Sequence, residues 1–452
     1  MENQILSLIE SKNFSHLKRI LSELNPADIA LILEEAEKHD LPWVFRILPK
    51  ELAAEVFVEM ESDMQQHLIE SFSDSELKGV MDELFMDDAV DIIDEMPASV
   101  AKRILKQTDS KTRQMINKLL AYPDSSAGSV MTTEYLNVKR NMTVDEAFDH
   151  IRKNAVDTES VYTCYVTDRS RKLLGVVTVK ELLLSSPDAV IEDLMETNII
   201  SAGTLDDREE VANLFEKYDL YSLPIVDKEN RLVGIITVDD AIDVMQEEAS
   251  EDIEKMAAIL PSEKSYLKTG VFETFKSRIP WLLFLMISAT VTGAIITSFE
   301  GRLSEWIGLI AFIPMLMGTG GNSGSQSSVT VIRALSLGDI EFSDIWRVIW
   351  KELRVSVVCG IVLGAINFLK LYFVDYLLLH SFDDGVHFIE MTAVSLTLVL
   401  VVIIAKLVGC TLPIVAKKMG FDPAVMASPL VTTILDALSL IIYFTIAILL
   451  LV

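Results

Sequence analysis

The chain has 452 residues, of which 50% are hydrophobic, and its 39 basic and 67 acidic residues give a formal net charge of −28. A surface this acidic repels phosphate backbones, so binding of nucleic acid is excluded as a leading function. At about 150 residues per domain, the length predicts roughly three folding units.

Charge and apolar surface are separated along the chain. Residues 280–452 hold 9 bases and 12 acids, net −3, which leaves a net charge of −25 to residues 1–279. The opening segment has an acid at position 2 and no long apolar core, so we expect no signal peptide and a cytosolic N-terminus. Three scattered cysteines offer neither a disulfide framework nor a CxxC metal site. An acidic cytosolic part followed by a membrane part is the predicted organisation.

Residues 1–122 repeat apolar residues at helical spacings of three and four, as in LSELNPADIALILEEAE (21–37) and DDAVDIIDEM (87–96). Two similar phrases, at 49–60 and 97–107, each begin with a proline, which is favoured at helix starts. The pattern predicts an α-helical N-terminal domain in which short helices stack into an acidic superhelix.

Two similar segments follow, KLLGVVTVKELL (172–183) and RLVGIITVDDAI (231–242), with Gly175 and Gly234 at equivalent positions. Each segment alternates like a strand and then continues as a helix, so the duplication predicts tandem α/β modules. The pair resembles CBS domains, a fold that dimerises and commonly senses adenosine ligands or ions.

The second module contains Thr237 and Asp240 in the order T-x-x-D, whereas the first has Glu181 in place of the aspartate. In CBS folds this order often serves a ribose, so ATP is a candidate ligand at Thr237 and Asp240. Helix capping by the same two side chains is the favoured alternative.

An acidic helix connects the second module to the membrane part, and an amphipathic lead-in follows it. Such charge runs are usually solvated faces. The position of this run directly before the apolar half favours a second interpretation, in which its acids hold cations. The acids are Asp239, Asp240, Asp243, Glu247, Glu248, Glu251, Asp252 and Glu254.

Five apolar segments predict a transmembrane domain of five helices. The first, PWLLFLMISATVTGAIITSF (280–299), would rise about 30 Å as a helix, which is one hydrocarbon thickness. Lysines and arginines gather before span one, between spans two and three, and between spans four and five, which places these loops in the cytoplasm and the C-terminus outside. The remaining spans are 306–332, 355–374, 391–416 and 423–452.

Asp436 lies near the middle of the fifth span, where a charged side chain costs about 3 kcal/mol or more. Thr432 and Thr433 precede it at helical spacings, and Asn322 and Gln326 add oxygen atoms in the second span. These oxygen-rich surroundings suit a hard cation such as Mg²⁺, bound through its hydration shell.

Three alternatives remain for these residues. Asp436 could be protonated, or it could form a structural pair with Lys406 in the fourth span. The run GTGGNSGSQSS (318–328) could serve close helix packing rather than ion binding. No HExxH, GxSxG or GxxxxGK[ST] motif is present, so the sequence does not indicate an enzyme.

The sequence resembles the MgtE-type magnesium channels. The resemblance is carried by IPMLMGTGGNSGSQSSVTVIRALSLGDI (313–340) and by residues 409–444, where a proline, DPA and P-x-x-T-x-x-x-D follow one another. It implies a homodimer in the cell (plasma or inner) membrane, with an ion path between subunits. Mg²⁺ would pass down its electrochemical gradient, and Asp436 matches the pore-lining aspartate.

The resemblance also implies feedback control. In the family, an equivalent connecting helix acts as a plug that is held shut when intracellular Mg²⁺ screens facing acidic surfaces. The candidate sensing residues are Asp87, Asp88, Asp91, Asp239, Asp240, Asp243, Glu247, Glu248, Glu251 and Asp252.

Two rival functions remain open. A transporter of Co²⁺, Mn²⁺ or Zn²⁺ is disfavoured because only the isolated Cys359 and Cys410 offer soft ligands near the candidate path. A CBS-regulated membrane sensor that conducts no ion would leave Asp436 a structural role. The expected domains are the N-domain (1–122), two CBS modules (123–190 and 191–246), the connecting plug helix with its lead-in (247–279) and the pore domain (280–452).

Overall fold

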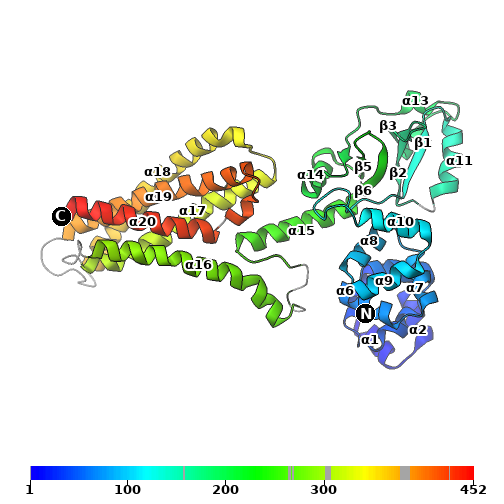
Figure 1. Cartoon of the computed structure of the whole chain (residues 1–452), viewed down its shortest axis with the longest axis horizontal. Helices are drawn as coiled ribbons and strands as arrows, with labels where there is room; N and C mark the ends of the chain where they lie inside the picture. The colour runs from blue at the N-terminus through cyan, green and yellow to red at the C-terminus, as the bar shows by residue number, and fades with distance from the viewer. Residues whose placement is uncertain are drawn as a thin grey trace. The chain divides into compact units, whose positions relative to one another are not determined.

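The computed structural model describes residues 2–155, 158–262, 266, 269–300, 307–376, 387–426 and 428–451. The chain divides into two compact units, Met1–Met245 and Gln246–Val452. The boundary falls within one helix, α15 (Val238–Met256), so the end of this helix belongs to the second unit (Figure 1).

Within the described residues, ten short helices form the N-terminal stack that the apolar spacing predicts. Pro49 and Pro97 are the N-cap residues of α5 and α9, so both helices begin directly after the prolines that mark them. Leu17, Leu68 and Ile104 are fully buried in a shared core. The helices are α1 (Glu2–Glu10), α2 (Phe14–Leu21), α3 (Pro26–Glu34), α4 (Leu41–Phe45), α5 (Lys50–Val58), α6 (Ser62–Ser71), α7 (Asp74–Met81), α8 (Met86–Glu95), α9 (Ala98–Gln107) and α10 (Ser110–Leu119).

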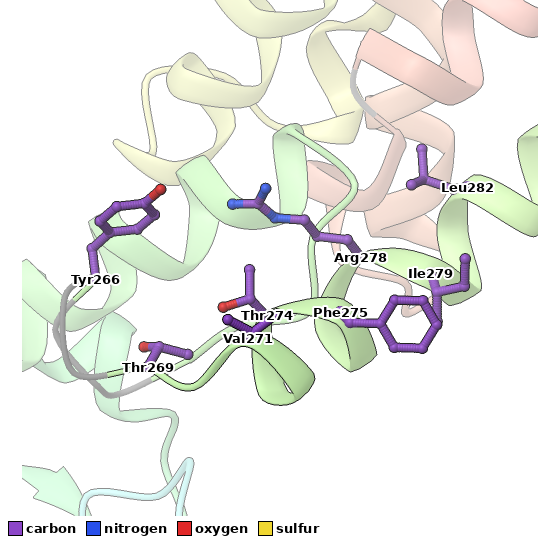
Figure 2. A pocket seen from close by; sticks show the side chains of 8 residues that line it. All are labelled: Tyr266, Thr269, Val271, Thr274, Phe275, Arg278, Ile279 and Leu282. Carbon is purple, nitrogen blue, oxygen red and sulfur yellow. The ribbon is translucent and has the colours of Figure 1, made fainter.

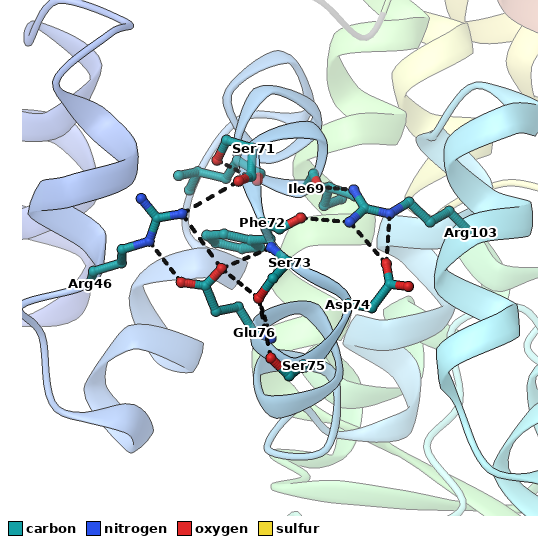
Figure 3. Close-up of polar contacts among 10 residues, drawn as sticks. Arg46, Ile69, Ser71, Phe72, Ser73, Asp74, Ser75, Glu76 and Arg103 are labelled. Atoms are coloured by element: carbon teal, nitrogen blue, oxygen red, sulfur yellow. Dashed lines mark hydrogen bonds and ion pairs between the residues drawn. The ribbon is translucent and has the colours of Figure 1, made fainter.

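Two arginines hold the turn between α6 and α7 (Figure 3). Arg46 Nε donates to Glu76 Oε1 at 2.7 Å, and this hydrogen bond lowers the pKa of Glu76 to about 2. Arg103 of α9 donates to the Phe72 carbonyl and forms an ion pair with Asp74 at 3.1 Å. Both arginines join segments about thirty residues apart, so they tie non-neighbouring helices of the stack together.

The predicted duplication appears as two three-stranded sheets of the same topology, β1-β2-β3 and β4-β5-β6 (Figure 1). In each sheet the first two strands are parallel and the third is antiparallel to the second. The first module contains β1 (Tyr135–Lys139), α11 (Val144–Asn154), β2 (Ser160–Thr167), β3 (Leu173–Thr178), α12 (Val179–Leu184) and α13 (Ile191–Leu194). The second contains β4 (Ala202–Gly203), α14 (Arg208–Tyr218), β5 (Ser222–Val226), β6 (Leu232–Thr237) and the start of α15.

The repeated glycines are required where the two modules cross. A Cβ on Gly175 would lie 2.8 Å from the sulfur of Met195, and a Cβ on Gly234 would lie 2.8 Å from the sulfur of Met131. Each glycine therefore admits the methionine segment that opens the other module. The duplication is thus an interlocked pair rather than two independent copies.

Helices dominate the second unit after α15. Helix α17 packs against α19 and α20, α18 packs against α19, and α16 packs against α20 (Figure 1). The long helices are α16 (Val271–Glu300), α17 (Ile313–Ser336), α18 (Ile345–Lys370), α19 (His387–Lys418) and α20 (Ser428–Leu451). Short turns flank them: η2 (Ile307–Phe312), η3 (Phe342–Asp344), the π-helical η4 (Leu371–Tyr376) and η5 (Pro423–Met426).

Four helical segments in the described part of the chain are long and apolar enough to cross a membrane: Val271–Phe299, Phe342–Val374, Phe388–Lys418 and Pro423–Leu450. They correspond to the predicted spans one, three, four and five. The predicted second span overlaps α17, a 24-residue helix whose many glycines and serines lower its hydropathy. The count of five spans is therefore not confirmed and stays a prediction.

Candidate functional site

Helix α17 carries the Gly/Ser segment and packs closely against two neighbours. A Cβ on Gly324 would lie 2.1 Å from Leu435 Cδ1 of α20, and a Cβ on Gly409 of α19 would lie 2.2 Å from the Gly324 carbonyl oxygen. No side chain fits at either position, so these glycines let the three helices approach closely. The packing interpretation of the Gly/Ser segment is supported for this buried face.

The glycine contacts also fix the register of α17 against α20. A Cβ on Gly320 would lie 2.8 Å from Ser439 Oγ, and the contact of Gly324 with Leu435 shows that the two helices run antiparallel. Asn322 therefore lies at the level of Asp436. Asn322 and the residue four positions later, Gln326, are both exposed, so they share a face of α17 that the described residues leave uncovered.

Asp436 is partly buried and, among the described residues, has no hydrogen-bond or ion-pair partner. Lys406 is buried but forms no ion pair with Asp436, so the predicted alternative of a structural pair between them is wrong. Thr432 lies against α17, where its Cγ2 would be 2.9 Å from a Cβ on Gly321, and Thr433 Oγ1 donates to a carbonyl one turn earlier at 3.0 Å. One chain thus supplies a row of oxygen atoms that does not by itself surround an ion.

A second group of carboxylates lies in the first unit, between the start of α8 and the start of α15. Asp88 of α8 and Asp240 of α15 are close enough for their charges to interact, as are Asp87 and Asp240. Burial is the main cause, and repulsion between these carboxylates adds to it, so the pKa values of Asp87, Asp88 and Asp240 each rise to about 7. We call the following group the acidic cluster: Asp87, Asp88, Asp91, Glu134, Glu159, Asp239 and Asp240.

Two glutamates that the sequence analysis missed belong to the acidic cluster. Glu134 Oε2 accepts from the Met86 N–H at 2.9 Å, which ties the first module to α8. Burial, followed by the charge of Asp87, raises the pKa of Glu159 to about 9, and its Oε2 is buried without a hydrogen-bond partner among the described residues. Glu134 and Glu159 directly precede the parallel strands β1 and β2. An acidic residue directly before each of two paired strands was the sequence signal that could have identified these glutamates.

The other predicted sensing residues divide between the two units. Asp91 and Asp239 add to the negative potential at the α8 carboxylates, so they complete the acidic cluster. Burial and then Asp239 raise the pKa of Asp243, which lies one turn further along α15. Glu247 and Glu248 lie past the boundary, in the second unit.

The end of α15 contacts the membrane helices of its own unit. Lys255 Nζ lies 2.5 Å from Glu251 Oε1 and 2.6 Å from Asp422 Oδ2, in the turn between α19 and α20. Ser336 Oγ, at the end of α17, donates to Asp252 Oδ2 at 3.3 Å. Burial and then Asp422 raise the pKa of Asp252. Glu251 and Asp252 are thus placed at the apolar helices of the second unit, not in the acidic cluster.

The T-x-x-D residues cap a helix. Asp240 Oδ2 accepts from the Thr237 N–H at 3.4 Å and from Thr237 Oγ1 at 2.6 Å. In the first module Glu181 Oε2 accepts from the Thr178 N–H at 2.8 Å, and Thr178 Oγ1 accepts from the Glu181 N–H at 3.2 Å. The capping alternative therefore describes both modules. Asp240 serves two purposes, because the same side chain also faces the acids of α8.

In the described part of the chain, no three His, Cys, Asp or Glu side chains stand close enough to hold a metal ion directly. Both carboxylate groups nevertheless present only oxygen donors, the kind that Mg²⁺ prefers. Since Mg²⁺ usually keeps several of its waters, spaced carboxylates and amides suit a hydrated ion bound through those waters.

Comparison with known proteins covers nearly the whole chain. Residues 313–446 match the MgtE family, described as a divalent cation transporter, and residues 24–125 match the MgtE intracellular N domain. Residues 127–188 and 191–247 each match the CBS domain. The expected N-domain and CBS pair are confirmed.

Full-length relatives carry the same family name. The chain is 35% identical over 439 residues to the magnesium transporter MgtE of Thermus thermophilus, covering 96% of this chain and 95% of the relative. It is 33% identical over 449 residues to the magnesium transporter MgtE of Bacillus subtilis, covering 98% and 96%. These relatives are named as transporters and not as enzymes.

A solved structure resembles the first unit. The cytosolic domain of the Mg²⁺ channel MgtE, crystallised in complex with ATP, is 32% identical with a TM-score of 0.52, and the match covers 54% of this chain and all of that chain. With the apolar helices of the second unit, these similarities indicate a membrane protein. The chain belongs to the MgtE family of magnesium transporters.

Proposed function

We propose that this chain imports Mg²⁺ across the plasma or inner membrane as a homodimer, and that cytosolic Mg²⁺ closes the path by binding its acidic surfaces. The observation that carries the proposal is the Asp436 carboxylate, which lies within a membrane-length helix and has no partner among the described residues. An ionised group at that depth needs water or a cation beside it.

The uncovered oxygens of α17 and α20 support an ion path. Asn322 and Gln326 share one exposed face of α17, and Asn322 is level with Asp436. Exposed amides are unfavourable against lipid, so this face suits either water or a second copy of the chain. Two copies facing each other would supply two carboxylates and four amides around one hydrated ion.

The acidic cluster supports control by cytosolic Mg²⁺. Seven carboxylates from α8, the first module and α15 gather in one unit, and burial followed by mutual repulsion raises the pKa values of four of them. The group members are Asp87, Asp88, Asp91, Glu134, Glu159, Asp239 and Asp240. A divalent cation would relieve this repulsion and so favour the compact arrangement. Several weak, water-bridged sites would give a steep response to an abundant ion.

Helix α15 could transmit this response because it is one continuous helix of 19 residues. Its first turn carries Asp239 and Asp240 of the acidic cluster, and its last turns contact α17 and the turn before α20 through Asp252 and Lys255. Ion binding at the start of the helix would therefore change the contacts that the end of the helix makes beside the proposed path.

The test of conduction is Mg²⁺ flux into liposomes that contain purified protein. Asp436→Asn should reduce the flux to the level of protein-free liposomes while the dimer remains intact by size-exclusion chromatography. Asp339→Asn is the matched control, because it removes the same charge from an exposed loop position and should leave the flux unchanged. Wild-type flux through Asp436→Asn would remove the residue's assigned role, whereas no flux through the wild-type protein would favour a sensor that conducts no ion.

The metal that is carried is tested in the same liposomes. A path lined only by oxygens should transport Mg²⁺ while Co²⁺, Mn²⁺ or Zn²⁺ compete weakly at equal concentration. Faster transport of one of these metals than of Mg²⁺ would identify a different substrate.

ATP binding to this chain stays a prediction, supported by the nucleotide in the similar cytosolic domain. At the predicted residues, Thr237 is hydrogen-bonded to Asp240, which lies among other acids. Phosphates held there would be repelled unless a cation accompanied them. Equilibrium dialysis of ATP against the full-length protein, with and without Mg²⁺, tests the prediction, and no binding in either condition would reject it.

A further inference from the structure

A groove of about 460 Å³ lies at the start of α16 and is unrelated to the acidic surfaces or to Asp436 (Figure 2). Most of its lining comes from one face of α16, where residues recur at spacings of three and four. Tyr266 and Thr269 of the preceding segment complete the lining. Leu260 donates its N–H to the Ser277 carbonyl at 3.0 Å, which ties Leu260 to α16.

The two ends of the groove differ in chemistry (Figure 2). The Arg278 guanidinium and the Tyr266 hydroxyl mark one end, and Thr274 of α16 lies near them. Phe275 and Leu282 lie at the other end. An arginine fork beside hydroxyl groups suits a phosphate, whereas an apolar slot suits a hydrocarbon chain.

This polarity follows the direction of α16 into the membrane. At the apolar end, Leu282 lies four residues beyond Arg278 along the helix, toward the centre of the candidate span Val271–Phe299. The polar end lies at the beginning of that span, which the charge distribution places on the cytoplasmic side. A phospholipid in the cytoplasmic leaflet would thus place its headgroup at the polar end of the groove and its acyl chains at the apolar end.

The charge of the groove distinguishes between lipid classes. Arg278 is exposed and has no ion-pair partner among the described residues. Glu273 lies on α16 but does not line the groove. An anionic headgroup gains the full attraction of the guanidinium, whereas a choline or ethanolamine headgroup would also bring a cation close to it.

We propose that this groove binds an anionic phospholipid of the cytoplasmic leaflet, with the lipid phosphate at Arg278 and one acyl chain along Phe275, Ile279 and Leu282. The proposal rests on the membrane placement of α16 within the proposed function. It adds a lipid site at the point where the cytosolic connection enters the membrane.

The test is lipid retention by full-length protein in mixed micelles of phosphatidylglycerol and phosphatidylcholine, measured by native mass spectrometry. Wild-type protein should retain phosphatidylglycerol in preference to phosphatidylcholine. Arg278→Gln should reduce phosphatidylglycerol retention by about tenfold, the effect of removing a hydrogen-bonded charge. Arg278→Lys should fall between the two, because it keeps the charge and loses the fork.

Lys276→Gln is the matched control, because it removes an equal exposed charge two residues away on a face of α16 outside the groove. It should leave retention within about twofold of wild type. Equal losses in the two Gln variants would show a general electrostatic surface and overturn the site. Equal retention of both lipids by wild-type protein, or inorganic phosphate displacing the lipid at millimolar concentration, would also overturn it.

The flux assay separates this proposal from the proposed function. Asp436→Asn should abolish Mg²⁺ flux and leave phosphatidylglycerol retention unchanged. If wild-type protein failed to transport Mg²⁺, retention at Arg278 would still decide the lipid site.

Discussion

The acidic cluster and the Asp436 region handle negative charge in opposite ways. In the first unit, seven carboxylates gather, and burial followed by their repulsion raises the pKa values of Asp87, Asp88, Glu159 and Asp240, so a cation changes how strongly they repel. In the second unit, a single carboxylate lies beside threonines and close to an uncovered row of amides. A crowded group of carboxylates suits a sensor, which must respond to ion concentration. An isolated carboxylate suits a path, which must release its ion.

The Asp436 region depends on the tight packing of α17 against α20. Gly324→Ala should destabilise the second unit by about 1–3 kcal/mol, because the added methyl group would overlap Leu435. Gly318→Ala, in the same helix, has open space around its Cβ and should have little effect. Thermal unfolding of the two purified variants measures the difference. Equal melting temperatures would show that α17 and α20 are not packed as described.

The proposed control by Mg²⁺ depends on the crowding of carboxylates in the acidic cluster. Replacing Asp88 and Asp240 together with Asn should keep the flux at high internal Mg²⁺ about tenfold above that of wild type, because two of the carboxylates that would bind the closing ion are then missing. Glu216→Gln, an exposed acid on α14, is the control and should close normally. Liposomes loaded with millimolar Mg²⁺ provide the assay. Normal closure of the double variant would reject the acidic cluster as the sensor.

Neutralising the acids of α15 itself tests the broader sequence prediction. Asp240, Asp243, Glu247 and Glu248 replaced together by their amides should also leave the path open at high internal Mg²⁺. Because only Asp240 of these four lies among the crowded α8 acids, we expect most of the effect from that one position. Flux of the Asp240→Asn single variant, set beside that of the quadruple variant, measures its share. Equal closure of the quadruple variant and wild type would contradict control by α15.

The raised pKa values predict how pH alters the cluster. Asp87, Asp88 and Asp240 have folded-state pKa values of about 7, above the usual 3.8, so the folded state binds more protons between these limits. Without Mg²⁺, stability should therefore fall as pH rises from about 4 to about 7. Hydrogen exchange at α8, corrected for intrinsic rates, should show that Mg²⁺ protects strongly at pH 8 and weakly at pH 5. Equal protection at both values would contradict binding by these carboxylates.

The contact at the end of α15 should have the smallest effect. Lys255→Gln removes a partly exposed bridge between Glu251 and Asp422, and such pairs contribute about 1 kcal/mol or less. We expect a small increase in hydrogen exchange over the last turns of α15. Lys228→Gln, in an exposed turn of the second module, serves as the control. Unchanged exchange in Lys255→Gln would show that the bridge does not hold the helix.

The sequence predicted what local patterns determine. Helical spacing located the N-terminal stack, and the repeated phrase around Gly175 and Gly234 revealed the paired modules. It did not show that each glycine admits a methionine of the other module, since that contact depends on the tertiary crossing.

Long-range contacts explain the residues that were missed. Glu134 and Glu159 join the acidic cluster because β1 and β2 pair side by side and lie against α8. The sequence alone offered no measure of that proximity. The suggested pairing of Asp436 with Lys406 failed for the same reason, since residues on neighbouring helices can point to different faces.

We propose that the acidic cluster closes the ion path and that ions crossing the open path pass Asp436. The most direct measurement is Mg²⁺ flux, at high internal Mg²⁺, through the Asp88→Asn, Asp240→Asn variant with and without Asp436→Asn. We expect that the double variant conducts and that adding Asp436→Asn reduces the flux to that of protein-free liposomes. Undiminished flux through the triple variant would contradict it, because the ion would then be taking a route that does not involve this carboxylate.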